Sequence, residues 1–225
     1  FVSVSINRSP IPFSDLKISS KLLEVTKNGK LMTLMVLTVP SFYGGLYDNT
    51  IELLNRYVRH QQVDGIVVDL RSNTGGDFRE ALLFTDIFIN GPLLQVRQNE
   101  GAFITKNYLY SGERNKDLKF EIEGPMVVLT SNQSASASEI FAAAIKDYRK
   151  GVIVGGNRTW GKGSIQRIVE LDKSLGGAIK LTIGKFTHVA LSPNAHKIVI
   201  TGIHITLFSL SFCVFFLKQL QTILQ

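Results

Sequence analysis

Three short apolar runs, each the length of a β-strand, constrain the fold of this chain more than any other feature. They span Gly65–Leu70, Met126–Leu129 and Val152–Val154, and the stretches Phe78–Ile89 and Ala137–Tyr148 between them have the pattern of helices. Strands without alternating polar residues are typical of a parallel sheet that is buried on both faces. The order strand, helix, strand, helix, strand is that of βαβ crossovers. The pattern predicts an α/β fold with a mostly parallel sheet.

Further elements surround this predicted core. Leu31–Val39 has the pattern of a strand and Thr50–Gln61 that of an amphipathic helix. Asn28 and Gly29 indicate a turn between two strand-like runs near the start of the chain. Residues Leu93–Phe120 predict shorter strands with turns, and Leu175–Phe186, which contains two consecutive glycines, predicts a small antiparallel hairpin arm.

Charge is high but scattered. The 225 residues carry a formal net charge of +7, and the densest basic cluster is only Lys146–Lys150 at a predicted helix end. Basic residues at a helix C-terminus complement the helix dipole, so we expect no nucleic-acid partner. The single cysteine, Cys213, excludes an internal disulfide. The chain begins at Phe1 without a signal peptide, and we expect it to be a piece of a longer protein.

The end of the chain differs in composition from the rest. Residues 198–217 include no formally charged side chain and several phenylalanines, and twenty such residues reach the length of a membrane span. Several threonines and serines interrupt the run, and its first half is β-branched. We therefore favour a strand followed by a short apolar helix over a transmembrane helix, which remains the alternative.

A serine precedes the Ala-rich helix predicted from Ala137. A serine hydroxyl is a weak nucleophile that needs an adjacent base, and the free N–H groups of a first helical turn stabilise negative charge. Ser136 is thus a candidate nucleophile, and the N–H of Ala137 is a candidate oxyanion donor. The alternative is that Ser134, Ser136 or Ser138 only caps the helix, as serines often do.

Lys162 lies between two glycines, 26 residues after Ser136. A lysine acts as a base near neutral pH only when desolvation lowers its pKa, and the adjacent Trp160 is a candidate apolar lid. One alternative is a solvated lysine in a glycine turn. Another is a phosphate-binding loop, because Gly156–Lys162 matches GxxxxGK, although Gly163 stands where magnesium binding requires Ser or Thr.

A polar loop, residues 71–76 with the sequence RSNTGG, follows the first of the buried strands. Ligands bind at the carboxyl ends of strands in α/β sheets, and consecutive glycines suit a backbone that must approach a substrate closely. An ordinary connection between a strand and a helix is the alternative.

Together these motifs resemble the catalytic core of the carboxy-terminal processing, or tail-specific, proteases of the S41 type. The resemblance runs from Lys30 to about Phe186 and rests on residues 39–46, 69–76, 134–148 and 161–166. It implies a Ser/Lys endopeptidase on a ClpP/crotonase-like α/β core, built from βαβ units with small antiparallel arms. It also implies that residues 31–197 form the catalytic core, with lead-in strands or a linker in residues 1–30 and an apolar tail in residues 198–225.

The resemblance also implies roles for single residues. Ser136 matches the nucleophile, Lys162 the general base, and Gln166 a glutamine that orients the lysine. Gly75 or Gly76, with Ala137, would form the oxyanion hole. Asp147 matches an aspartate proposed as a third catalytic member. Eleven helical residues would separate its Cα from that of Ser136 by about 16 Å, so we expect a structural role for this aspartate.

The function that follows is hydrolysis of peptide bonds in proteins selected by their C-termini. We expect an extended protein or peptide substrate, no metal and no cofactor, and a location in the periplasm or cell envelope. The sequence leaves the oligomeric state open. The alternative is a non-catalytic S41-like module that binds a peptide or an apolar ligand.

Overall fold

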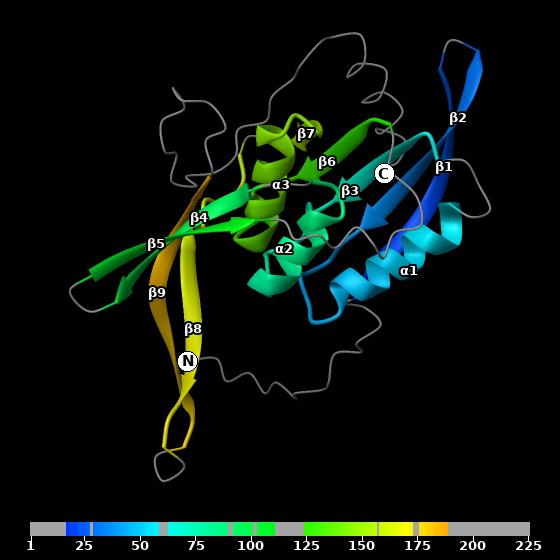
Figure 1. Cartoon of the computed structure of the whole chain (residues 1–225). Coiled ribbons are helices and arrows are strands. Elements are labelled where there is room, and N and C mark those ends of the chain that lie inside the picture. Colours follow the sequence, from blue (N-terminus) through cyan, green and yellow to red (C-terminus); the bar gives the residue numbers. More distant parts are fainter. Residues whose placement is uncertain are drawn as a thin grey trace, which may run out of the picture.

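A computed structural model of the chain describes residues 17–27, 29–58, 63–89, 92–100, 103–110, 124–156, 158–172 and 176–188 (Figure 1). A five-stranded sheet forms the centre, in the order β1-β2-β3-β6-β7. Its strands are β1 (Ser19–Lys27), β2 (Lys30–Thr38), β3 (Gly65–Asp69), β6 (Met126–Thr130) and β7 (Gly151–Gly155). Three helices pack with it: α1 (Leu46–Val58), α2 (Phe78–Asp86) and α3 (Ala137–Asp147).

The central sheet is parallel except at one edge. β2, β3, β6 and β7 run in the same direction, and only β1 pairs antiparallel, with β2. The three apolar runs of the sequence are the adjacent strands β3, β6 and β7. The predicted mostly parallel sheet is therefore confirmed. The turn at Gly29, where φ is +78°, joins β1 to β2, so one strand from the first 30 residues, β1, belongs to this sheet.

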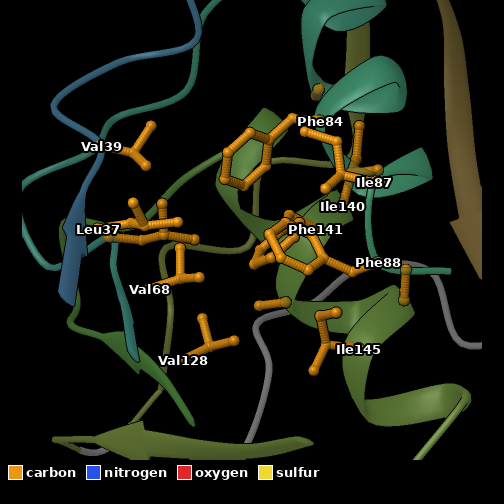
Figure 2. Packing of buried hydrophobic residues seen from close by; sticks show 14 of the residues in the cluster. Leu37, Val39, Val68, Phe84, Ile87, Phe88, Val128, Ile140, Phe141 and Ile145 are labelled. Atoms are coloured by element: carbon orange, nitrogen blue, oxygen red, sulfur yellow. The ribbon is translucent and has the colours of Figure 1, made fainter. Parts of the chain in front are cut away.

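Both faces of the central strands are buried, which explains why their sequences do not alternate. On one face Leu37, Val68 and Val128 contact the helices, where Phe84 of α2 and Phe141 of α3 lie 5.0 Å apart between ring centroids (Figure 2). The other face carries a second buried cluster, whose members are Val25, Leu34, Val36, Val67, Val127 and Leu129. The core therefore fixes the position of α3, the helix that carries the candidate serine at its start.

The first helix begins four residues earlier than the pattern predicts, at Leu46 instead of Thr50. The reason is a tertiary contact from α2. The Glu80 carboxylate accepts hydrogen bonds from the N–H groups of Gly45 and Tyr47, at 2.8 and 3.0 Å. It thereby satisfies donors that a helix start leaves unpaired. α2 itself starts where predicted, with Asp77 as its N-cap, and ends at Asp86.

A second, antiparallel sheet has the strand order β5-β4-β9-β8. Its strands are β4 (Pro92–Glu100), β5 (Phe103–Tyr110), β8 (Ser164–Glu170) and β9 (Ala178–His188). The predicted hairpin arm is confirmed, and it is longer than expected because its first strand begins at Ser164. The β8–β9 hairpin projects away from the central sheet (Figure 1).

The predictions for residues 198–217, a strand with a short helix or a membrane span, lie outside the described residues. Within the described residues, no helix combines the length and the apolar composition that crossing a bilayer requires. The predicted boundaries of the core, residues 31–197, also remain a prediction.

Candidate active site

Two loops meet at the carboxyl ends of β3 and β6. The hydroxyl of Ser134 donates to the carbonyl of Leu70 at 2.7 Å, and the hydroxyl of Ser138 donates to the carbonyl of Asn73 at 2.8 Å. The N–H of Ala135 also donates to the Asn73 carbonyl, at 3.2 Å. Side-chain and main-chain bonds thus bring the 71–76 loop against the start of α3, as the position of both motifs at strand ends predicts.

Asn73 links these loops to the end of β2. Its side chain is fully buried, its Nδ2 donates to the carbonyl of Val39 at 2.9 Å, and its Oδ1 accepts from the N–H of Gly75 at 2.8 Å. A buried amide whose donor and acceptor are both engaged rigidifies its surroundings. The loop that contains Gly75 is therefore held in one conformation.

A salt bridge precedes this loop. The Arg71 guanidinium contacts both carboxylate oxygens of Asp69, with Nε 2.9 Å from Oδ1 and Nη2 2.7 Å from Oδ2. Hydrogen bonding to Asp69 raises the pKa of Arg71 above its ordinary value, against the opposing effect of burial. The hydroxyl of Ser131 donates to the carbonyl of Arg71. This bond joins the loop after β6 to the 71–76 loop.

Ser136 has an unusual backbone conformation at the N-cap of α3. Its φ of 56° and ψ of −113° lie in a region that non-glycine residues rarely adopt, at a cost of about 1–3 kcal/mol. Such strained residues cluster at functional sites. Ser136 occupies the cap position, so the capping interpretation and the nucleophile interpretation do not exclude each other.

Gly75 contacts the backbone around Ser136 directly. A Cβ at Gly75 would lie 2.8 Å from the carbonyl oxygen of Ala135 and 2.9 Å from Cβ of Ser136, and φ at this glycine is +107°. Any side chain would collide and would strain the backbone. The consecutive glycines suggested that the backbone of this loop closely approaches a neighbour. In the structure, the neighbour that Gly75 approaches is the backbone around Ser136.

Glu139 connects the serine to the lysine. Its carboxylate is fully buried, and its Oε2 accepts from the N–H groups of Ser136 and Lys162, each at 2.8 Å. The other oxygen, Oε1, accepts from the hydroxyl of Thr159 and the N–H of Gly161, both at 2.6 Å. The backbone nitrogens of Ser136 and Lys162 share Oε2 as their acceptor. They are therefore separated by at most twice the 2.8 Å length of these two hydrogen bonds.

Sequence reasoning missed Glu139 as a site residue, although a signal for it exists. A serine followed three residues later by glutamate is the capping-box pattern, which predicts that the glutamate reaches back to the backbone of the serine. The bond from Ser136 to Glu139 matches this pattern. The bonds to residues 159–162 come from a segment twenty positions away, which no local pattern indicates.

The side chain of Lys162 is half-buried, and no hydrogen bond engages its amine within the described part of the chain. Gln166, the predicted orienting residue, is exposed on β8 and donates to the hydroxyl of Thr182 at 3.5 Å. None of the recorded contacts joins Gln166 to Lys162, so this role stays a prediction. Trp160, the expected lid, is 72% exposed.

The predicted oxyanion donors differ in availability. The N–H of Gly75 is already engaged by Asn73, whereas none of the hydrogen bonds among the described residues uses the N–H of Gly76 or Ala137. Asp147 lies at the opposite end of α3 from Ser136, as predicted.

The phosphate-loop alternative is wrong. Such a loop places its lysine at the N-terminus of a helix, where the N–H groups bind phosphate. Here Lys162 is followed by strand β8, which begins at Ser164.

Curated relatives of the chain are named as proteases. It is 38% identical over 161 residues to the tail-specific protease of Haemophilus influenzae, covering 68% of this chain and 22% of that protein. It is 36% identical over 148 residues to carboxyl-terminal-processing peptidase 3, chloroplastic, of Arabidopsis thaliana, covering 65% of this chain and 26% of that protein. The chain thus spans about a quarter of the length of these relatives.

The fold is also similar to a solved structure. The photosystem II D1 C-terminal processing protease superimposes with a TM-score of 0.66 at 24% identity, over 91% of this chain and 48% of that one. This likeness concerns the fold. A sequence model of peptidase family S41 matches residues 33–204, which is most of the chain and includes both loops of the candidate site. The chain therefore belongs to peptidase family S41.

Proposed function

We propose that this chain is the catalytic core of a serine endopeptidase of the C-terminal processing type, with Ser136 as nucleophile and Lys162 as general base. The observation that carries the proposal is the Glu139 carboxylate, which holds the backbone N–H groups of Ser136 and Lys162 on one oxygen at 2.8 Å each. A buried carboxylate that spans two segments positions the serine and the lysine relative to each other. Serine nucleophiles need such a neighbouring base.

In the proposed reaction, Oγ of Ser136 attacks the carbonyl carbon of the scissile peptide bond, and its proton passes to the lone pair of Nζ of Lys162. The carbonyl oxygen takes up the electron pair and becomes an oxyanion. The intermediate then collapses, the C–N bond breaks, and the departing amine takes the proton from Lys162. Water attacks the resulting ester with Lys162 again as base, which releases the acid and restores the hydroxyl of Ser136.

The developing oxyanion needs donors that are not already paired. We assign this role to the N–H groups of Ala137 and Gly76, because the N–H of Gly75 donates to Asn73 at 2.8 Å. Ala137 is the first residue of α3, so the positive end of the helix dipole adds to the stabilisation. Removal of one such donor typically slows catalysis about 100- to 1,000-fold.

The proposal is tested with purified variants and a fluorogenic peptide library. Ser136→Ala and Lys162→Ala abolish hydrolysis, and so does Lys162→Arg, whose guanidinium stays protonated and cannot act as a base. Ser19→Ala and Lys180→Ala are the matched controls, because both residues are exposed and lie on β1 and β9, outside the two loops of the site. They retain the activity of the wild type.

Residual hydrolysis in either alanine variant at the site contradicts the Ser/Lys dyad. Activity of Lys162→Arg equal to that of the wild type contradicts the role of the amine as base. Peptide binding without hydrolysis by the wild type would instead support a non-catalytic binding module.

The substrate class proposed is an extended polypeptide chosen by its free C-terminus. The support is the naming of the relatives, of which the Haemophilus influenzae protein is matched over 22% of its length. Peptides with an amidated C-terminus test this selection. We retain the periplasm or cell envelope as the proposed location if the source is bacterial, although one relative is named chloroplastic.

A further inference from the structure

Trp160 is the only tryptophan of the chain, and its indole is 72% exposed. It is the most exposed of the large apolar residues whose side chains the structure describes. A large aromatic side chain left in water forgoes the stabilisation that burial gives, and aromatic residues so placed are often binding contacts. The exposure of this residue therefore needs a reason.

The backbone that presents the indole is firmly held. The N–H of Trp160 donates to the carbonyl of Ser134 at 3.0 Å, and the hydroxyl of the preceding Thr159 is bonded to Glu139 at 2.6 Å. The following Gly161 donates its N–H to the same carboxylate at 2.6 Å. Hydrogen bonds thus hold the residue before Trp160, Trp160 itself and the residue after it. This fixed backbone keeps the indole at the surface.

The same bonds place Trp160 at the proposed site. Its bonding partner Ser134 is two residues before Ser136, and Trp160 is itself two residues before Lys162. The backbone of Trp160 therefore lies beside the segment that carries Ser136. A large ring attached at this point is a candidate contact for a substrate side chain that flanks the scissile bond.

The other exposed large apolar side chains lie on different elements. Among the residues whose side chains the structure describes, they are found on β2 or on the β8–β9 hairpin: Leu31, Ile168, Val169, Ile179 and Leu181. The residues next to the serine, Ala135 and Ala137, are small and buried.

We propose that Trp160 is a substrate-contacting residue that selects an apolar side chain of the peptide next to the scissile bond. This inference rests on the proposed peptidase function. The bound peptide covers the indole and so removes its apolar surface from water. An acidic side chain against the indole would lose its hydration without gaining a partner, so the contact favours apolar over acidic side chains.

The test uses the complete 225-residue chain carrying Ser136→Ala, which binds peptides without cleaving them. Because Trp160 is the only tryptophan, its emission reports its own surroundings. Saturation with a peptide that has leucine or phenylalanine beside the scissile position shifts the emission to the blue. Anisotropy of a labelled peptide measures binding independently.

Activity measurements then separate a specificity role from a structural one. In the chain with an intact serine, Trp160→Ala lowers kcat/KM for the leucine peptide about tenfold or more. The same variant lowers kcat/KM for a glycine peptide less than about threefold. Trp160→Phe retains most of the activity towards both peptides. Leu31→Ala is the matched control, since Leu31 is 58% exposed at the opposite end of β2 and leaves both values unchanged.

Saturating peptide without an emission shift overturns the proposal, and so does an equal loss for the leucine and glycine peptides. These outcomes are distinct from failure of the proposed function. A chain that binds peptide with an emission shift but cleaves none contradicts catalysis and supports the contact. A chain that cleaves peptides without an emission change contradicts only the role of Trp160.

Discussion

Glu139→Gln keeps the shape of the side chain and removes its charge. The carboxylate accepts four hydrogen bonds: Oε2 from the N–H groups of Ser136 and Lys162, and Oε1 from Thr159 and Gly161. An amide offers only one oxygen, so its NH2 group must face two former donors. The hydroxyl of Thr159 can reverse and accept from this group, whereas an N–H cannot. The amide therefore places its NH2 group at the Oε1 position, and the N–H of Gly161 loses its partner.

The expected loss of stability follows from these contacts. A buried N–H without a partner costs about 1–3 kcal/mol, and each of the two bonds at Oε2 weakens by about 1 kcal/mol when its acceptor becomes neutral. The free energy of unfolding therefore falls by about 3–5 kcal/mol, a large part of the 5–15 kcal/mol typical of a domain. We expect kcat to fall about a hundredfold, because the positions of Ser136 and Lys162 relative to each other become less defined.

Urea unfolding and peptide hydrolysis measure the two effects. Glu80→Gln is the matched control, because Glu80 also accepts two N–H bonds at the start of a helix, from Gly45 and Tyr47. This substitution should lower the unfolding free energy by about 1–3 kcal/mol and leave kcat unchanged. The reasoning is refuted if Glu139→Gln unfolds within about 1 kcal/mol of the wild type, or if Glu80→Gln lowers kcat equally.

Three further predictions concern the surroundings of the site. Gly75→Ala lowers the unfolding free energy by about 2–4 kcal/mol, because φ is +107° and the new Cβ would collide with Ala135 and Ser136. Gly44→Ala, where nothing lies within 4 Å, is the control in the same urea titration and stays near the wild type. Arg71→Lys loses the two-pronged contact with a carboxylate and costs about 1 kcal/mol or less, because the arginine is partly exposed; equal midpoints for both proteins would contradict this. Burial, and secondarily an adjacent carboxylate, raises the pKa of Tyr148 above its ordinary value of 10.0, so its contribution to stability is complete below about pH 10 and is lost as the pH rises further. Tyr148→Phe should therefore show a shallower loss of unfolding free energy above pH 10 than the wild type, and an identical pH dependence would argue against this origin.

The pattern of apolar residues was enough to predict the mostly parallel central sheet. Runs such as Gly65–Asp69 and Met126–Thr130 have apolar residues on both sides of the strand, and only a sheet covered on both faces buries them. The βαβ order then allows a small number of topologies, one of which is observed. The start of α3 was also evident locally, because its helical pattern begins at Ala137 directly after a serine-containing turn.

The hydrogen bonds that connect the parts of the site depend on contacts between distant segments of the chain. The earlier start of α1 depends on Glu80, which lies on a different helix, and the link between Ser136 and Lys162 depends on the buried carboxylate of Glu139. The exposure of Trp160 and the engagement of the Gly75 N–H by Asn73 likewise come from contacts outside the motif concerned. The periodicity of apolar residues in the sequence indicates which side chains are buried. It does not report which buried acceptor a distant N–H will reach, because that partner is selected by the packing of the whole chain.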